Sequence, residues 1–180
     1  MRGPGTFTGL RVVMSLAMGL ARGAAIPVAG LDYLPLLAAA PCRLFSAEVW
    51  VCTFARKGLV YVQGFCGRRA EPLLDPAALP VDRAAEAIRA RRASVALVGS
   101  GVSRDPGFWT SELPGAEVLD ESWDHPAPDV LLQRAGSCVF GPGPLQPLYL
   151  RVSDAEANLE RIAESRGLDP DTARKRIYEP

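Results

Sequence analysis

A nearly continuous apolar segment, Val12 to Arg22, comes shortly after the first residue and predicts a helix, because Gly19 is its only helix-breaking residue. Apolar side chains follow the i, i+3, i+4, i+7 spacing of one helix face, at Leu10, Val13, Met14, Ala17 and Leu20 or Ala21. The opposite side is only half polar, with Arg11, Ser15, Met18 and Arg22. A helix that is apolar nearly all round is buried on more than one side. We therefore expect one face to lie on a sheet and the other on the same domain or on a partner.

Further along the chain, from Ser46, the hydrophobic pattern no longer has a helical period. The runs 48–54 and 59–65 are rich in β-branched and aromatic residues and flank the turn residues 55–58, a pattern typical of a hairpin. Other predicted elements are buried strands at 26–29 and 95–98, helices at 33–40 (capped by Asp32) and 82–92, and short helices at 130–135, 153–166 and 170–177. The segments 66–81 and 103–128 are expected to be irregular connections. Helices that alternate with strands favour an α/β layer with parallel strands.

Two glycine-rich turns are candidates for binding chemistry. The run from Gly3 to Arg11 holds three glycines and a proline, so we expect a turn that feeds the N-terminus of the first helix. Such a turn either presents N–H groups to an anion or carbonyl, or simply connects two elements. It matches neither the P-loop nor the dinucleotide-binding spacing. Gly99-Ser100-Gly101 ends a predicted strand, where open α/β sheets place ligands, but a tight turn is the preferred interpretation.

Composition and charge narrow the possible functions. Twenty basic residues balance twenty acidic ones, which argues against tight binding of a polyphosphate backbone by this chain alone. No uncharged apolar run reaches the length of about 18 residues that a membrane span needs. Basic residues at Arg2 and Arg11, the apolar run that follows, and the small residues after Arg22 also imitate a signal peptide, so a secreted small domain is one alternative.

The sequence contains no convincing catalytic or metal-binding constellation. Its four cysteines include no C-x-x-C pair, and His125 is the only histidine, so a zinc site is not expected. Buried reduced thiols are the default, although four cysteines also permit disulfides. The carboxylates around His125 suggest a solvated loop rather than an acid–base site; they are Asp120, Glu121, Asp124 and Asp129.

The exact residues of the first turn are more informative than its general glycine-rich pattern. Gly3-Pro4-Gly5-Thr6-Phe7-Thr8-Gly9-Leu10-Arg11, with Ile26 to Leu31 after the helix, resembles the TsaB (YeaZ) family, dimerization subunits of bacterial tRNA threonylcarbamoyladenosine biosynthesis. Weaker likenesses lie in the 55–61 turn, in Gly99-Ser100-Gly101 and in Pro147 to Arg151. Phe54 stands where the family has an Asp, so a role for that carboxylate is not carried over. In the family a strand and a sizeable N-terminal piece precede the motif, so this chain is expected to lack that part.

The resemblance implies a fold, an activity and partners. The fold is α/β, an actin-like ATPase (ribonuclease H-like) two-lobe fold with an incomplete first lobe, within the superfamily that also holds the Gcp-type proteins. The expected parts are a first-lobe remnant (1–45), a second lobe (46–151) and a helical tail (152–180). The implied function is a non-catalytic cytoplasmic subunit that pairs with TsaD, the catalytic subunit, with TsaE as an ATPase, and supports threonylcarbamoyl transfer to the adenosine beside the tRNA anticodon. No cofactor, metal or membrane contact is expected on the chain itself, since ATP and metal belong to the partners and tRNA is contacted indirectly.

The resemblance also assigns roles to residues of the first turn and helix. The structural motif comprises Gly3, Pro4, Gly5, Thr6, Phe7 and Gly9. The partner-binding residues are expected on the first helix, where the same surface also permits a homodimer: Thr8, Arg11, Val12, Ser15, Met18 and Arg22. Two functional alternatives stay open beside secretion, a Gcp-like peptidase or ATPase-type enzyme and a non-functional truncated member of the family.

Overall fold

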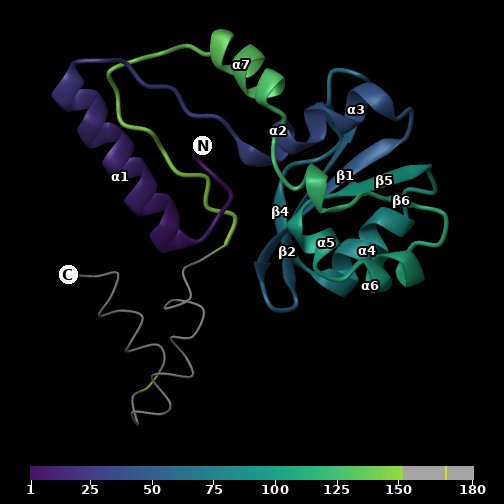
Figure 1. Ribbon diagram of the computed structural model, residues 1–180. Coiled ribbons are helices and arrows are strands. Elements are labelled where there is room, and N and C mark those ends of the chain that lie inside the picture. Colours follow the sequence, from purple (N-terminus) through teal and green to yellow (C-terminus); the bar gives the residue numbers. More distant parts are fainter. Residues whose placement is uncertain (152–168, 170–180) are drawn as a thin grey trace. The chain divides into compact units, whose positions relative to one another are not determined.

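The computed structural model describes residues 1–151 and residue 169. Residues Met1–Leu150 form one compact unit (Figure 1). The predicted tail helices at 153–166 and 170–177 lie outside the described residues.

A mixed sheet forms the centre of this unit. The predicted hairpin is confirmed as β1 (Glu48–Arg56) and β2 (Leu59–Cys66), which pair antiparallel with Val51 opposite Gln63. The predicted strand 95–98 is β5 (Val95–Val98), which runs parallel to β1. Short strands that the sequence did not reveal complete the order β3-β2-β1-β5-β6, with β4 also on β2; they are β3 (Glu71–Pro72), β4 (Ala77–Pro80) and β6 (Glu117–Val118).

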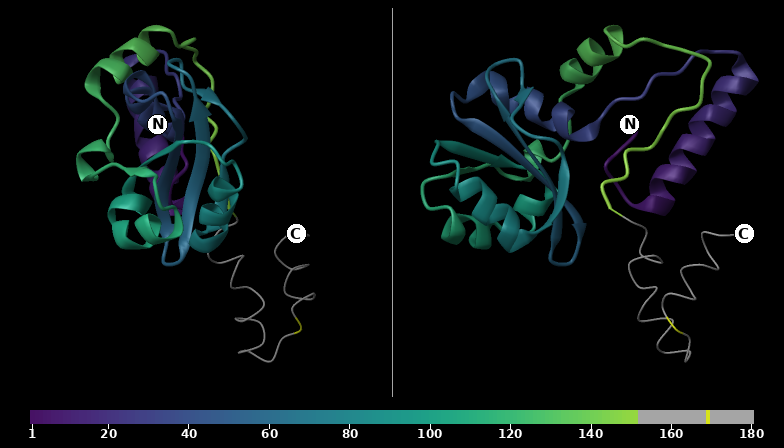
Figure 2. Two further views of the ribbon diagram at one scale, coloured as in Figure 1. Left: turned by 90° about the vertical axis from the view of Figure 1, so that its right-hand side faces the viewer. Right: turned by 180° about the vertical axis from the view of Figure 1, so that it is seen from behind.

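Helices cover both faces of the sheet, because successive side chains of a strand point to opposite sides (Figure 2). On one face, Val49 and Val51 of β1 pack against α2 (Tyr33–Ala39) and α3 (Pro41–Leu44). On the other face, Trp50 and Cys52 pack against α4 (Val81–Arg89), α5 (Ser100–Ser103) and α6 (Pro106–Glu112). A smaller cluster joins Leu36 of α2 to Val130 of α7 (Pro128–Gly136).

The segment 103–128 was predicted to be irregular, and this prediction was wrong. It contains α6, β6 and a 3-10 helix, η1 (Glu121–Trp123). Trp109 explains why α6 forms there, since its ring is completely buried and its indole N–H donates to the Gly101 carbonyl oxygen at 2.9 Å. A single anchoring ring therefore organises a segment too short and too polar to show a helical period.

The first helix, α1 (Phe7–Ala24), begins five residues earlier than predicted. Half of the glycine-rich run therefore belongs to the helix rather than to a turn. Thr6 is the N-cap residue, and its hydroxyl oxygen accepts from the Gly9 N–H at 3.3 Å. Gly9 suits this position because a Cβ there would lie 2.6 Å from the Thr6 hydroxyl oxygen. The helix ends at Ala24, and the next residue, Ala25, caps it in the left-handed conformation.

The segment after α1 also differs from the prediction. Residues 26–29 do not form a buried strand: Ile26 is exposed, and only Val28 makes an isolated antiparallel bridge, to Gly141. Asp32 stands at the N-cap position of α2 without a side-chain capping bond, because its carboxylate pairs with Arg2 instead. Long-range partners therefore replace the local interactions that the sequence suggested.

Candidate functional site

The beginning of α1 is held against the returning chain by a stack of three side chains. The Phe7 ring lies 4.9 Å from the Tyr149 ring, centroid to centroid, and the Arg11 guanidinium lies 3.9 Å above the Phe7 ring. Arg11 Nε also donates to the Tyr149 hydroxyl at 3.3 Å. Arg11 was predicted to bind a partner, and the structure gives it contacts within the chain.

The inner side of α1 faces the rest of the unit only along a narrow line. Met14 and Ala21 are 6% and 7% exposed, while Leu10, Ala17 and Met18 are half-buried. The predicted apolar stripe is therefore only partly right, because two of its members, Val13 and Leu20, are exposed and do not face the rest of the unit. Less of the helix is buried than its sequence suggested, because no sheet face packs along its whole length.

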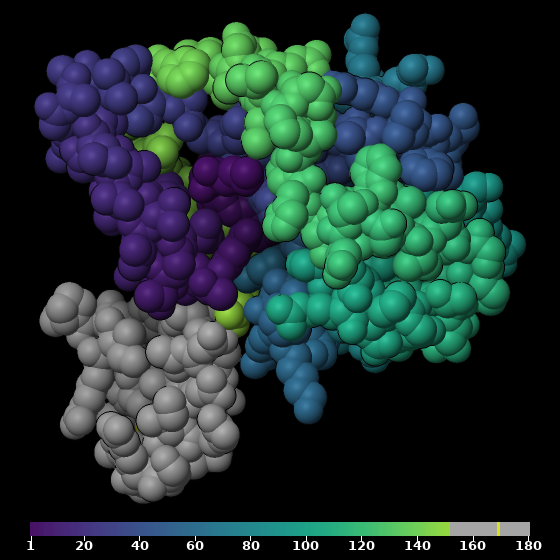
Figure 3. Space-filling view, viewed as in Figure 1, coloured from purple at the N-terminus to yellow at the C-terminus, as the bar shows by residue number. Residues whose placement is uncertain are grey.

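The outer side of α1 is an uninterrupted apolar surface, which we call the α1 apolar face. Its four members are 56% to 65% exposed: Val12, Val13, Leu16 and Leu20. Val12, Leu16 and Leu20 are spaced four residues apart and so form one row along the helix. Gly19 adds open space to the same surface, because a Cβ there would meet no heavy atom within 4 Å. In Figure 3, α1 (purple) forms an outer edge of the Met1–Leu150 unit.

Of the predicted partner-binding residues, only Val12 lies on this face, and the others lie beside it. Val12 belongs to it, and Thr8, Arg11, Ser15 and Arg22 are exposed on its flank. Met18 is half-buried and, with Arg22, lines an apolar hollow of about 360 Å³ between α1 and the segments near Pro27 and Pro142. Sequence reasoning missed Leu16 and Leu20, although their spacing from Val12 was a usable signal. Their role in binding, like that of the predicted set, stays a proposal.

The glycine turn before α1 is engaged in backbone pairing. The Arg2 N–H donates to the Leu31 carbonyl at 2.9 Å, and the Tyr33 N–H donates to the Gly3 carbonyl at 2.8 Å. Gly3 has a φ of +129°, and a Cβ on it would lie 2.7 Å from the Leu148 carbonyl oxygen, so a larger residue does not fit. These contacts favour a structural connector over a phosphate cradle.

A side-chain pair and a tyrosine tie the same turn to its surroundings. Arg2 forms a bidentate pair with Asp32, with nitrogen–oxygen distances of 2.6 and 2.9 Å, and this hydrogen bond raises the pKa of Arg2. The Tyr61 hydroxyl of β2 donates to the Gly5 carbonyl at 3.0 Å. The turn is thereby fixed both to the start of α2 and to the central hairpin.

The Gly99-Ser100-Gly101 turn is also explained by packing. Gly99 has a φ of +111°, and a Cβ on Gly99 or on Gly101 would lie 2.8 Å from the Cys52 carbonyl oxygen of β1. The Ser100 hydroxyl accepts from the Phe54 N–H at 3.1 Å. Phe54 itself lies under the Arg104 guanidinium, 4.1 Å from its ring centroid. The turn therefore packs the end of β5 closely against β1 and leaves no space for a side chain at Gly99 or Gly101.

The carboxylates around His125, from Asp120 to Asp129, have structural roles. Asp120 caps η1 through Ser122, and these hydrogen bonds lower the pKa of Asp120. Asp124 accepts from the Ser103 hydroxyl, and its backbone carbonyl accepts from the Tyr33 hydroxyl at 2.9 Å. Burial of the Tyr33 phenol raises its pKa, and the nearby Asp124 charge adds to this. Asp129 pairs with Arg43, and His125 is exposed. In residues 1–151, no group of His, Cys, Asp and Glu side chains is arranged to hold a metal ion.

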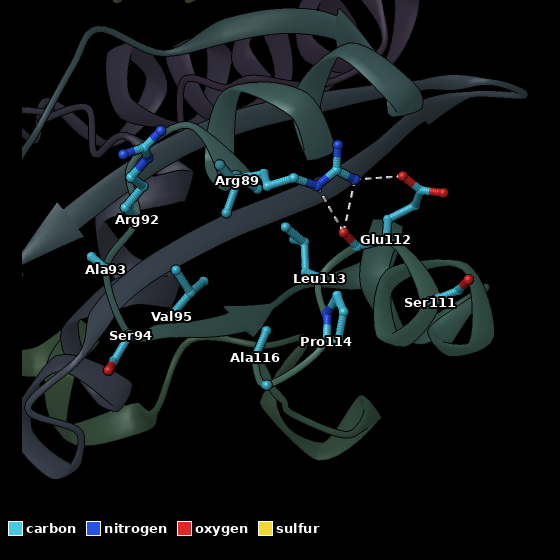
Figure 4. Close-up of a pocket in the computed structure, with 12 residues that line it drawn as sticks. Arg89, Arg92, Ala93, Ser94, Val95, Ser111, Glu112, Leu113, Pro114 and Ala116 are labelled. Carbon is cyan, nitrogen blue, oxygen red and sulfur yellow. Dashed lines mark hydrogen bonds and ion pairs between the residues drawn. The ribbon is translucent and has the colours of Figure 1, made fainter.

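A larger hollow, of about 780 Å³, lies at the amino end of β5 between the ends of α4 and α6 (Figure 4). Arg89 reaches across it and donates to the Glu112 carboxylate at 2.5 Å and to the Glu112 carbonyl at 2.7 Å. Ser94 and Ser111 line it with no base beside them. Because its one carboxylate is already paired, the hollow holds no nucleophile and base that could act together.

Comparisons with known proteins identify the family of the chain. Residues 1–102 match the family described as "TsaD: tRNA N6-adenosine threonylcarbamoyltransferase". Over 61 residues, a third of this chain, the sequence is 43% identical to the tRNA threonylcarbamoyladenosine biosynthesis protein TsaB of Escherichia coli. It is 46% identical over 61 residues to the protein of the same name from Haemophilus influenzae. The matched part spans only 26% of the length of each of these relatives.

Solved structures extend the likeness to most of the fold. A Pseudomonas aeruginosa protein described as similar to peptidase YEAZ superposes with a TM-score of 0.63 and 27% identity. The superposition covers 83% of this chain and 71% of the Pseudomonas chain. YeaZ from Pseudomonas aeruginosa gives a TM-score of 0.57 and 25% identity at the same coverage. The predicted α/β fold class and the resemblance to TsaB (YeaZ) are confirmed. The chain belongs to the family of TsaD, tRNA N6-adenosine threonylcarbamoyltransferase, and its relatives within that family are the TsaB (YeaZ) proteins.

Proposed function

We propose that this chain is an accessory subunit of tRNA threonylcarbamoyladenosine biosynthesis and that it binds a TsaD-like catalytic subunit through the α1 apolar face. The relatives named TsaB support the pathway, and the matched TsaD family supports a partner of similar fold. The chain then works in the cytoplasm, where tRNA is modified. None of the helices in the described residues combines the length and the apolarity that a membrane crossing requires.

The observation that carries this proposal is the exposure of four large aliphatic side chains on one side of one helix. Isolated apolar residues on a surface are ordinary, whereas a contiguous row marks a binding surface. Complete burial of a Val or Leu side chain contributes about 1.5 to 3 kcal/mol, so covering what remains exposed of Val12, Val13, Leu16 and Leu20 contributes about 4 to 7 kcal/mol in total. A helix that presents such a row suits a second helix laid along it.

The chemistry of transfer is assigned to the partners. The described residues offer no activated nucleophile or metal cluster that would favour a peptidase or ATPase-type enzyme, and the glycine turns are packed against the protein's own backbone. ATP and metal are therefore proposed to reside on the TsaD-like subunit and on a TsaE-like ATPase. The chain's own contribution is to hold the catalytic subunit in a productive form.

Co-purification with the TsaD-like subunit of the same organism tests the proposal. Leu16→Asp places a charge in the middle of the α1 apolar face and should abolish recovery of the complex. Leu132→Asp is the matched control, since Leu132 is 76% exposed on α7 and away from the face. Ser15→Asp and Met18→Asp, on the flank, should weaken the complex less. Retention of the complex by Leu16→Asp, or equal loss with Leu132→Asp, would show that the interface lies elsewhere.

A second copy of the chain is the other candidate for covering the same face. Light scattering on the chain alone, with and without Leu16→Asp, separates the two cases. A dimer that dissociates on adding the TsaD-like subunit is expected if both partners share the α1 apolar face. A dimer that survives Leu16→Asp would place self-association on a different surface.

A further inference from the structure

Arginine side chains gather around a small polar hollow on the side of the sheet that α3 covers. The hollow has a volume of about 360 Å³ and is lined by Ala39, Arg43, Arg68, Arg69, Gln133, Arg134 and Ser137. The four arginines come from three places far apart in the sequence: α3, the turn between β2 and β3, and α7. No carboxylate lines the hollow. Tertiary folding has therefore concentrated positive charge in a chain whose formal net charge is zero.

One of these arginines is held in place, and the others are not paired. Arg43 donates to the Asp129 carboxylate at 2.8 Å and to the Gln133 side-chain oxygen at 2.6 Å, which fixes its guanidinium between α3 and α7. The side chains of Arg68, Arg69 and Arg134 have no ion pair and no hydrogen bond to other described residues. Elsewhere arginines are mostly engaged, as Arg2 is with Asp32 and Arg91 with Glu48. After Asp129 is counted against Arg43, the hollow keeps three uncompensated charges.

Such a cluster of guanidinium groups favours binding of an anionic ligand with several oxygen atoms. Guanidinium groups bind phosphate through parallel N–H donors, and like charges held together repel until an anion lies between them. The rim charges Arg68 and Arg69 are exposed, so the ligand need not be small enough to be enclosed. We propose that this arginine hollow binds phosphate groups of an RNA backbone. The choice of RNA as the source of phosphate rests on the proposed role in tRNA modification; the anion-binding geometry does not.

Direct contact between this chain and RNA differs from the expectation drawn from composition. Overall neutrality predicted only indirect contact with tRNA, and three free guanidinium groups still make this a modest contact. For each phosphate contact, the binding affinity falls by about 3.5-fold when the concentration of monovalent salt rises from about 50 to about 200 mM. Three contacts together therefore reduce the affinity by about 40-fold over this range. Binding should therefore be detectable at low salt and steeply dependent on it.

Fluorescence anisotropy with the full chain and a labelled anticodon stem-loop RNA, from a tRNA that reads codons beginning with A, tests this inference. The variant Arg68→Gln/Arg69→Gln should bind more weakly at low salt and lose only about 3.5-fold over the same salt range, because one free arginine remains. The matched control is Arg56→Gln/Lys57→Gln, which removes the same charge from two exposed neighbours next to the β1–β2 turn. That control should keep the steep salt dependence. Equal thermal unfolding of both variants confirms that folding is unaffected.

The outcomes separate this inference from the proposed function. No RNA binding at low salt, or a variant with the parent's salt dependence, would overturn the arginine hollow as an RNA site. Displacement of the RNA by micromolar ATP, with no effect of a salt of equal ionic strength, would reassign the hollow to a free nucleotide and likewise overturn it. RNA binding that needs Arg68 and Arg69, together with failure to co-purify a TsaD-like subunit, would sustain the inference while removing the proposed interface.

Discussion

Replacing Gly101 by Ala adds one methyl group at the start of α5, where β1 and β2 leave no room for it. The new Cβ would lie 2.7 Å from a Val60 methyl carbon and 2.8 Å from the Cys52 carbonyl oxygen. Val60 can rotate or shift, but the Cys52 carbonyl belongs to the backbone of β1, which pairs with β2 at Cys52 and with β5 up to the preceding residue, Val51. The structure must therefore move backbone or helix to admit the methyl group.

The expected cost follows from these contacts. Overpacking by one methylene in a well-packed core destabilises by about 1 to 3 kcal/mol, and a backbone obstacle places this case at the upper end. Better helix propensity of Ala over Gly returns up to about 1 kcal/mol. The net loss in free energy of unfolding should be about 2 kcal/mol. With a urea dependence of about 2 kcal/mol per molar, the midpoint falls by about 1 M.

Urea unfolding followed by tryptophan fluorescence measures this loss, since Trp50 and Trp109 are fully buried and Trp109 donates to the Gly101 carbonyl. Gly107→Ala is the matched control: it lies in the first turn of α6, and its Cβ would come no closer than 3.8 Å to the Asp105 carboxylate oxygen. The control should be as stable as the parent or up to about 1 kcal/mol more stable.

A double-mutant cycle with Val60→Ala tests the named contact. Removing the Val60 methyl groups should make Gly101→Ala less costly, with a coupling of at least about 0.5 kcal/mol. The carbonyl contact remains, so recovery should be incomplete. If Gly101→Ala matches the parent in stability, close packing is not the reason for glycine at this turn. If the two substitutions are strictly additive, Val60 is not the neighbour that resists the methyl group.

Two further predictions concern titratable groups. The hydrogen bond from Arg91, together with one from the Trp50 indole N–H, lowers the pKa of Glu48. The interaction therefore stabilises the fold fully at pH values above the ordinary pKa of Glu, and this stabilisation is lost as the pH falls through the lowered pKa of Glu48. Glu48→Gln should therefore be less stable than the parent in urea unfolding at about pH 7, and the difference should shrink at about pH 3; an unchanged difference would contradict the assignment. Burial raises the pKa of the Cys52 thiol and raises that of Cys42 to about 11, while Cys66 and Cys138 are only half-buried. Ellman's reagent at about pH 8 should therefore label two thiols in the native chain and four in urea; rapid reaction of all four in the native chain would contradict this.

Local patterns were sufficient for elements that carry their own signal. The hairpin predicted at 48–54 and 59–65 was correct because two runs of β-branched and aromatic residues and the turn between them lie within one stretch of chain; in the structure the strands extend further, to Arg56 and Cys66. The short strands β3, β4 and β6 were not predicted. Strands β3 and β6 have two residues each, and the four residues of β4 include two alanines and Pro80, without the run of large apolar residues that identified the equally short β5. Helix α6 was missed for a related reason: its stability comes from one buried ring, Trp109, and from a hydrogen bond to another element.

For the candidate sites, the sequence by itself determined that α1 is a helix apolar on nearly every side and that a glycine-rich turn precedes it. Periodicity is a local property, so it shows which side chains share a face but not which face is covered. Tertiary structure decided that Met14 and Ala21 lie inward and that Val12, Leu16 and Leu20 remain exposed, because the returning chain at Tyr149 packs on the opposite side. The arginine hollow lay entirely beyond sequence reasoning, since α3, the β2–β3 turn and α7 become neighbours only when the sheet forms.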